Sequence, residues 1–273
     1  MRRSTLRAAL GSAAVAAVLV PAAPAGAIVG GTVDTVHTNV GLVRFTAPDG
    51  RFRCSGTLIS PKVVLTAGHC TEGPAVNVRV SFDDQLRPDP FAAGISATEK
   101  AAREQFYIAG TAHPDPGWDG QLNFAKQHDQ GVVVLDQAAT TKWPSVKPAP
   151  LLPVGTLDAN QGALKNREFT LVGYGVDIGE KKAQIVQQQR MMTTAPLKSV
   201  QSEVVTFQNS ASDSKAGGGS CFGDSGGGAF LGSAVLGDAS YVNSLTCNAT
   251  GSYQRVDTTY SRKFLDFWIN ASK

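Results

Sequence analysis

Gly223-Asp224-Ser225-Gly226-Gly227 places one serine in a run of residues too small to pack a core. Glycines beside a serine let backbone N–H groups come close to a reacting atom, because no Cβ stands in the way. A nucleophile next to an oxyanion hole has this composition. A surface loop can have it too, because glycine and serine favour turns in any protein. The rest of the chain has to distinguish the two interpretations.

A serine nucleophile needs a general base, usually a histidine, and an acid that orients the base. The chain has four histidines, and all of them precede Ser225: His37, His69, His113 and His128. The segment 223–227 also matches the G-x-S-x-G elbow of the α/β-hydrolases, but in that fold the histidine follows the serine. The order of the residues therefore argues against an α/β-hydrolase.

His69 is the strongest candidate for the base. It lies in Leu65-Thr66-Ala67-Gly68-His69-Cys70, directly after a strand-like run and next to a cysteine that can fix its position. A buried structural histidine is the alternative interpretation. We expect the other three histidines in solvated loops.

Asp129 is the strongest candidate for the orienting acid. It stands directly before the strand-like run 130–135, and a strand start can bury a carboxylate and hold it still. The competitors are Asp115, Asp119 and Asp136.

The first 27 residues have the features of a signal peptide. Three arginines precede an apolar run of 13 residues, 8–20, which is too short to span a bilayer. Ala25-Gly26-Ala27 then provides a small-residue cleavage site. We predict a signal peptide over residues 1–27 and a secreted protein. A transmembrane anchor and a cleavage site after Ala25 are the alternatives.

The leader also accounts for the net positive charge. It holds three of the 25 Lys and Arg residues and none of the 22 Asp and Glu residues, which leaves 22 of each sign in the mature chain. Recognition of nucleic acid needs clustered basic residues. A mature chain of balanced charge gives no indication of a nucleic-acid partner.

Four cysteines in an exported protein indicate two disulfides, for which three connectivities are possible. We favour Cys54–Cys70 and Cys221–Cys247, because each joins near neighbours in the sequence. Zinc ligation is the alternative, but the chain has no C-x-x-C pair. The sequence contains no convincing metal cluster and no cofactor motif.

Short apolar, β-branched runs alternate with glycine, proline and Asx turns, which is typical of all-β barrels or sandwiches. The expected strands are 40–45, 57–59, 63–66, 76–82, 132–135, 169–174 and 204–207. Helical periodicity is clear only over 261–270. Residues 143–153 contain four prolines and cannot lie inside a sheet, so we interpret them as a link between two β-rich halves.

These motifs, in this order, resemble those of the chymotrypsin-like (trypsin-fold) serine proteases, in particular secreted bacterial ones with two disulfides. The matching segments are Ile28-Val29-Gly30-Gly31, residues 54–60 leading to residues 65–70, residues 128–135, and residues 221–227. The histidine and serine segments are highly specific together, whereas the segment around Asp129 is a looser match. The resemblance spans residues 28–273.

The resemblance implies two six-stranded antiparallel β-barrels with a C-terminal helix and the active site between the barrels. The first barrel is expected over residues 28–142, the linker over 143–153, and the second barrel with the helix over 154–273. In the implied mechanism Ser225 attacks the scissile carbonyl, His69 transfers the proton and Asp129 orients His69. The N–H groups of Gly223 and Ser225 form the implied oxyanion hole.

Asp224 also acquires a role from the resemblance. In this family the new α-amino group of the mature N-terminus, here Ile28, forms a buried ion pair with the aspartate that precedes the serine. Cleavage after Ala27 would expose Ile28 directly. Export itself would then activate the enzyme, with no separate propeptide.

The pocket for the substrate residue before the cleaved bond is harder to align. The resemblance places it at Gly219, Ser220, Ser240, Val242 and Gly251. Because Gly219 is not acidic, a preference for Arg or Lys loses its usual basis, and we predict small or medium apolar residues at the cleaved position.

The expected partners are protein or peptide substrates and protein protease inhibitors. We expect a monomer that needs no cofactor and has no membrane association after signal cleavage. The alternative function is that of an inactive relative used for binding. Esterase activity at the same site would be secondary to proteolysis.

Overall fold

A computed structural model describes residues 28–121, 127–165, 167–178, 184–186, 188–209, 218–242 and 244–273 of the chain. The predicted signal peptide, residues 1–27, lies outside these ranges. Within them, no helix has both the length and the apolar character that a bilayer-spanning helix requires.

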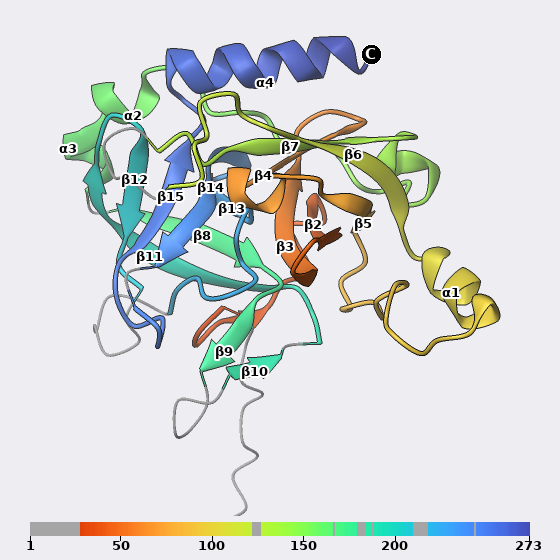
Figure 1. Cartoon of the computed structure of the whole chain (residues 1–273). Coiled ribbons are helices and arrows are strands. Elements are labelled where there is room, and N and C mark those ends of the chain that lie inside the picture. The colour runs from red at the N-terminus through yellow and green to blue at the C-terminus, as the bar shows by residue number, and fades with distance from the viewer. Residues whose placement is uncertain are drawn as a thin grey trace, which may run out of the picture.

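Six antiparallel strands close into the first barrel, coloured orange to yellow-green in Figure 1. In chain order they are β2 (Val40–Ala47), β3 (Gly50–Leu58), β4 (Val63–Thr66), β5 (Val76–Ser81), β6 (Ile108–Pro114) and β7 (Gly131–Leu135). Around the barrel the order is β2-β3-β4-β7-β6-β5, and β5 pairs with β2 to close it.

The second barrel also closes from six antiparallel strands, coloured green to blue in Figure 1. They are β8 (Glu168–Gly173), β11 (Met191–Val200), β12 (Val204–Phe207), β13 (Gly228–Leu231), β14 (Ala234–Val242) and β15 (Gly251–Arg255). The order is β8-β11-β12-β15-β14-β13, and β13 pairs with β8 to close it. A short strand, β1 (Thr32–Val33), adds to β11, and β9 (Val176–Ile178) pairs with β10 (Gln184–Val186) as a separate hairpin.

Strand β4 shows why some of these runs are apolar on both faces. Val64 packs with Val43 inside the first barrel. Val63 and Leu65 point to the opposite face, because side chains alternate along a strand, and they join the apolar cluster that fills the second barrel. The two barrels therefore share buried surface, which fixes their relative position.

In the described ranges the α-helices packed around the barrels are α1 (Ala97–Glu104), α2 (Thr156–Ala159), α3 (Gln161–Leu164) and α4 (Thr259–Ala271). The side chain of Thr258 caps the start of α4 by accepting the Ser261 N–H. Helix α4 contacts β4 and β7 of the first barrel, where Trp268 stacks on His113. Figure 1 shows α4 lying along one side of the molecule, across both barrels.

The prolines of segment 143–153 do not prevent contacts with both barrels. Ala149 donates its N–H to Leu58 in β3, and Leu152 donates its N–H to Val235 in β14. Each of the seven expected strand runs coincides with or overlaps a strand of one barrel or the other, and the expected helix lies within α4. The structure confirms the prediction of two six-stranded barrels followed by a C-terminal helix.

Candidate active site

Two neighbouring strands bring His69 and Asp129 together. His69 lies in a 3₁₀ turn, Gly68–Cys70, directly after β4, and Asp129 lies two residues before β7, which pairs with β4. The fully buried Asp129 carboxylate accepts the main-chain N–H of His69 at 2.8 Å and lies 2.9 Å from its ring Nδ1. These contacts fix both the turn and the orientation of the imidazole.

The two groups stabilise each other's charged forms. Burial acts to lower the pKa of His69, but the hydrogen bond and negative charge of Asp129 outweigh it and the pKa is raised. Burial acts to raise the pKa of Asp129, but contacts with His69 and a hydrogen bond from Ser240 outweigh it and the pKa is lowered. The Ser240 hydroxyl donates to Oδ2 of Asp129 at 2.5 Å and accepts the side-chain amide of Gln127. Asp129 is therefore an ionised, oriented carboxylate.

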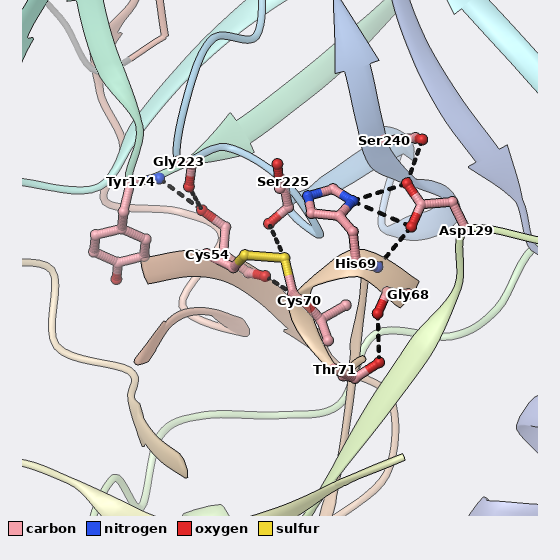
Figure 2. The surroundings of a disulfide bond; sticks show 12 residues. Cys54, Gly68, His69, Cys70, Thr71, Asp129, Tyr174, Gly223, Ser225 and Ser240 are labelled. Carbon is pink, nitrogen blue, oxygen red and sulfur yellow. Dashed lines mark hydrogen bonds and ion pairs between the residues drawn. A yellow bond between two sulfur atoms is a disulfide. The ribbon is translucent and has the colours of Figure 1, made fainter. Parts of the chain in front are cut away.

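Ser225 lies on the other side of the imidazole. Figure 2 shows the His69 ring between Asp129 and Ser225, with one ring nitrogen toward each. The Ser225 carbonyl accepts the N–H of Ser55 in β3 at 2.8 Å, and the Gly226 N–H donates to Ala239 in β14 at 2.7 Å. The serine is thus held by one strand of each barrel.

Gly226 has to be a glycine for this loop to form. Its φ is +80°, and a Cβ there would come within 2.4 Å of the Ser55 carbonyl oxygen. The loop therefore approaches β3 too closely for any side chain at that position.

Gly223 is oriented by its neighbours. The Phe222 carbonyl accepts the N–H of Val176 in β9 at 2.9 Å. The C=O and N–H of a trans peptide point in opposite directions. The N–H of Gly223 therefore points away from β9, which leaves it available to a ligand.

Two disulfides brace these segments, with the favoured connectivity. Cys54–Cys70 ties the His69 turn to β3, and Cys221–Cys247 ties the start of the serine loop to the segment before β15. The sequence separations are 16 and 26 residues, and closing loops of this size stabilises a fold by about 3 kcal/mol each in the chain-entropy model. The Cys54 and Cys70 sulfurs lie near the His69 ring, but they are bonded to each other and offer no thiolate to a metal.

Asp224 is buried beneath the serine loop. Its carboxylate accepts the N–H groups of Cys221 at 2.9 Å and Gly175 at 2.8 Å. Burial raises the pKa of Asp224 to about 7, although these bonds and the charge of Arg53 act to lower it. Among the described residues, none of the ion pairs identified involves Asp224. In the described part of the chain, this buried carboxylate therefore has no salt-bridge partner, which is a costly arrangement for a buried charge.

Ile28 is also buried, and the residue that follows it docks beside the serine loop. Val29 and Gly219 exchange two backbone hydrogen bonds, of 2.9 and 3.1 Å. In the full chain the Ile28 nitrogen belongs to the peptide bond with Ala27 and carries no charge.

A cavity of about 420 Å³ opens beside Ser225 and His69. Three of the five expected pocket residues line it: Ser220, Ser240 and Val242. On the side of the first barrel it is lined by Trp118 and Glu72, and the Trp118 indole N–H donates to the Glu72 carboxylate at 2.6 Å. The cavity is the space in which a substrate chain could lie against both Ser225 and His69.

The other two expected pocket residues, Gly219 and Gly251, lie against a residue that the sequence did not single out. A Cβ on Gly219 would lie 2.1 Å from Cγ of Asn209, and one on Gly251 would lie 2.6 Å from its Oδ1. The buried Asn209 amide donates to the Ser220 carbonyl at 2.9 Å, while its Oδ1 has no partner among the described residues. Asn209 thus fills the space between these two glycines, and because the contact forms only in the folded chain, no sequence pattern marked it.

Behind Asp129 lies a second buried carboxyl group, that of Asp238. Gln130 donates its side-chain amide to Oδ1 of Asp238 at 3.2 Å, while Oδ2 has no partner among the described residues. Burial and the nearby charge of Asp129 raise the pKa of Asp238 well above its ordinary value. Burial thus favours the protonated form of this carboxyl group.

Asp238→Asn is expected to stabilise the fold at pH 8 and to have much less effect at pH 4. The pKa of Asp238 is higher in the folded protein than in the unfolded chain, so the unfolded chain releases this proton at a lower pH. The stability of the wild-type protein therefore declines as pH rises above the pKa of the unfolded chain. The amide cannot ionise and removes that decline. Thermal unfolding of both proteins across this pH range measures it, and an equal difference in Tm at pH 4 and pH 8 would contradict the assignment.

The three remaining histidines do not line the cavity. His37 bonds to the buried carboxylate of Asp34 at 3.0 Å, and His128 packs against the ring of Tyr260. His113 lies in β6, so its expected place in a loop is wrong. The strand was missed because its sequence, IAGTAHP, has only one β-branched residue before its central threonine.

The comparisons with known proteins agree with this architecture. A model of the trypsin family matches residues 28–264. A search among curated proteins found no significant match.

Three solved structures illustrate the shared fold. HL collagenase is 18% identical with a TM-score of 0.59, and the alignment covers 90% of this chain and 96% of that one. A mutant of human heparin binding protein is 17% identical with a TM-score of 0.63, covering 90% and 98%. A scabies mite inactivated protease paralogue is 16% identical with a TM-score of 0.60, covering 89% and 100%. With the family model spanning nearly all of the chain after residue 27, this protein belongs to the trypsin family.

Proposed function

We propose that this chain is a secreted serine endopeptidase that hydrolyses peptide bonds through Ser225, His69 and Asp129. One observation carries the proposal. The imidazole is fixed at 2.9 Å from a buried carboxylate through Nδ1, while its other nitrogen faces the serine. This arrangement is what proton transfer from a serine hydroxyl requires.

In the proposed reaction, Ser225 Oγ attacks the scissile carbonyl carbon and His69 Nε2 accepts the hydroxyl proton. Asp129 stabilises the resulting imidazolium. His69 then gives the proton to the leaving amine, which departs and leaves an acyl-enzyme. A water molecule repeats the sequence, with His69 as base, and releases the carboxylic acid and free Ser225.

The oxyanion that forms at each addition step needs hydrogen-bond donors. The main-chain N–H groups of Gly223 and Ser225 are the proposed donors, and the orientation of the Phe222–Gly223 peptide supports the first of them. Loss of one such donor typically costs about 3–4 kcal/mol of transition-state stabilisation.

Maturation is part of the proposal. Removal of residues 1–27 during export would leave the charged amine of Ile28 as the new terminus. The buried Asp224, with a pKa of about 7 in the full chain, is the proposed partner of that amine. The docking of Val29 on Gly219 supports this, because it holds the start of the mature chain next to the serine loop.

Binding without catalysis is the alternative function. Two of the structural neighbours have names that point to it, a heparin binding protein and an inactivated protease paralogue. The intact set of Ser225, His69 and Asp129 in this chain favours the enzyme.

For the substrate, we propose a small residue before the cleaved bond. Asn209 occupies the space between Gly219 and Gly251 that a large side chain would otherwise enter, and its amide excludes an acidic side chain at position 219. Val242 lines the cavity beside Ser225 and His69. A shallow pocket of this kind disfavours Arg and Lys as well as large aromatic residues.

Asn209→Ala is expected to shift this preference toward larger residues. Removing the side-chain amide of Asn209 opens the base of the pocket. One methylene group more or less in a pocket changes the discrimination between two substrates by about 10-fold or more. The measurement is the ratio of kcat/KM for peptides with Leu and with Ala before the cleaved bond, taken within each enzyme so that a general loss of activity cancels. Asn160→Ala, at an exposed position between α2 and α3, is the control. An unchanged ratio in Asn209→Ala would contradict the role of Asn209.

The experiment that tests the proposed function is a peptide-library cleavage profile on the purified secreted protein, with Ser225→Ala as control. We expect cleavage after small residues that disappears in Ser225→Ala. Cleavage mainly after Arg or Lys would contradict the pocket, and an absence of Ser225-dependent cleavage would contradict the enzyme.

A further inference from the structure

Ser55, in β3 of the first barrel, contacts the serine loop of the second barrel through its main chain and its side chain. It is fully buried. Its N–H donates to the Ser225 carbonyl at 2.8 Å, and its hydroxyl donates to the Gly223 carbonyl at 3.0 Å. One residue outside the serine loop thus contacts both proposed oxyanion-hole residues.

The Ser55 hydroxyl has a fixed direction. It accepts the main-chain N–H of Tyr174 at 2.9 Å, which occupies a lone pair and directs its single hydrogen toward Gly223. Figure 2 shows the main-chain groups of Tyr174 and Gly223 close together, beside the Cys54–Cys70 disulfide and next to Ser225. The hydroxyl therefore bridges the end of β8 and the serine loop.

The hydrogen bond to Gly223 pins a peptide that could otherwise rotate. The Gly223–Asp224 peptide is held at its carbonyl by Ser55 and at its N–H by the Cys221 carbonyl, at 3.1 Å. Gly223 has a φ of +91° and no Cβ, so side-chain sterics do not restrain it. The direction of its N–H depends on the hydrogen bonds at the two flanking peptides.

We propose that Ser55 is a positioning residue for the oxyanion hole. Its hydroxyl holds the carbonyl of the Gly223–Asp224 peptide and so fixes the backbone of Gly223, whose N–H then points at the developing negative charge. The inference rests on the proposed function. Ser55 touches neither substrate nor reacting atoms and acts through the loop alone. Its contribution appears in the transition state, where the oxyanion is formed, and not in the binding of the substrate chain.

Ser55→Ala is expected to lower kcat about 10-fold, with KM changed less than twofold, because removal of a whole oxyanion donor costs about 10²–10³-fold. Active sites are counted by burst titration and kcat is calculated per active site, so that a loss of folded protein does not change the measured kcat. A peptidyl boronic acid, which forms a tetrahedral adduct at Ser225, should bind about 10-fold more weakly. A reduced-amide peptide of the same sequence lacks the carbonyl, and its affinity should not change.

Two further variants keep the test decisive. Ser55→Gly removes the same hydroxyl together with Cβ, and it should show the same loss of kcat per active site. Ser60→Ala removes a buried hydroxyl that accepts the Val63 N–H in the turn between β3 and β4, and it should lose stability without losing kcat.

Normal kcat and boronate affinity in Ser55→Ala and Ser55→Gly would overturn the inference and leave the proposed function intact. Equal weakening of the boronate and the reduced amide would also overturn it, because that pattern indicates general distortion of the cleft. A wild-type protein without Ser225-dependent turnover would overturn the proposed function itself.

Discussion

Ser225→Ala and His69→Ala should each lower kcat for peptide hydrolysis by about 10⁶-fold. In the proposed mechanism Ser225 and His69 act as one unit, because the hydroxyl is a nucleophile only while the imidazole accepts its proton. The double variant should therefore be no slower than either single variant. A small residual rate should remain, supplied by the oxyanion donors and by substrate binding.

The measurement is single-turnover kinetics on one cleaved peptide, with thermal unfolding as a check on the fold. The His69 ring stays about 30% exposed and Ser225 is only partly buried, so neither truncation should disturb the core. Additive losses in the double variant would show that the two residues do not cooperate in one step, contrary to the proposed mechanism.

Protein that begins at Ile28 should be about 10³-fold more active than protein that begins at Gly26. Breaking a buried ion pair by removing one partner costs about 3–5 kcal/mol, and each 1.4 kcal/mol corresponds to a factor of ten. Two extra residues move the charged amine away from Asp224, which then stays buried without a cation. Asp224→Asn should reduce the activity of the Ile28 form by a similar factor.

N-terminal sequencing of the secreted protein, together with kcat/KM for each defined terminus, tests this prediction. Asp158→Asn is the matched control, because this carboxylate is exposed and pairs with Arg255, whereas Asp224 is buried. Full activity in protein that begins at Gly26 would contradict the ion pair.

The proposed ion pair between Ile28 and Asp224 should also change how the stability of the protein depends on pH. In the full chain the pKa of Asp224 is about 7, against 3.8 when unfolded. As pH rises, Asp224 loses its proton first in the unfolded state. The free energy of unfolding therefore declines from about pH 4 to pH 7, by about 4 kcal/mol for this difference in pKa. The amine of Ile28 favours the charged carboxylate, and this decline should therefore be absent in the processed protein.

The sequence was most informative where chemistry constrains residue type. The order of His69 and Ser225 argued against an α/β-hydrolase. The structure brings both residues to one cavity, and the buried Asp129 bonds to His69. Strand runs such as 63–66 and 204–207 were predictable because each is apolar and β-branched, and each is buried on both faces. The roles of these residues in catalysis remain predictions.

Other strands were hidden because tertiary contacts, not their own composition, bury them. Strand β15, GSYQR, is mostly polar and yet buried throughout, and the charge of its Arg255 is paired with Asp158 and Asp257. Helix α1 buries none of its residues, so it has no apolar stripe, and only the capping box of Ser96 and Glu99 marks it.

The roles of Ser55 and Asn209 could not be predicted from the sequence, because these roles also depend on tertiary contacts. Ser55 lies in the segment 54–60 that carries the family resemblance, but nothing in that segment indicates a contact with Gly223, and Asn209 belongs to no motif. Ser55 reaches Gly223, 168 residues later, and Asn209 lies between Gly219 and Gly251. Only a structure that closes both barrels brings these partners together.

The most direct test of the central claim is labelling of the secreted, Ile28-terminated protein with a fluorophosphonate, followed by mass spectrometry of the modified peptide. We expect one label per chain, on Ser225, with none at that position in Ser225→Ala and much slower labelling in His69→Ala. A folded protein with the correct terminus that resists the reagent, or carries it elsewhere, would contradict a serine endopeptidase and favour the binding protein.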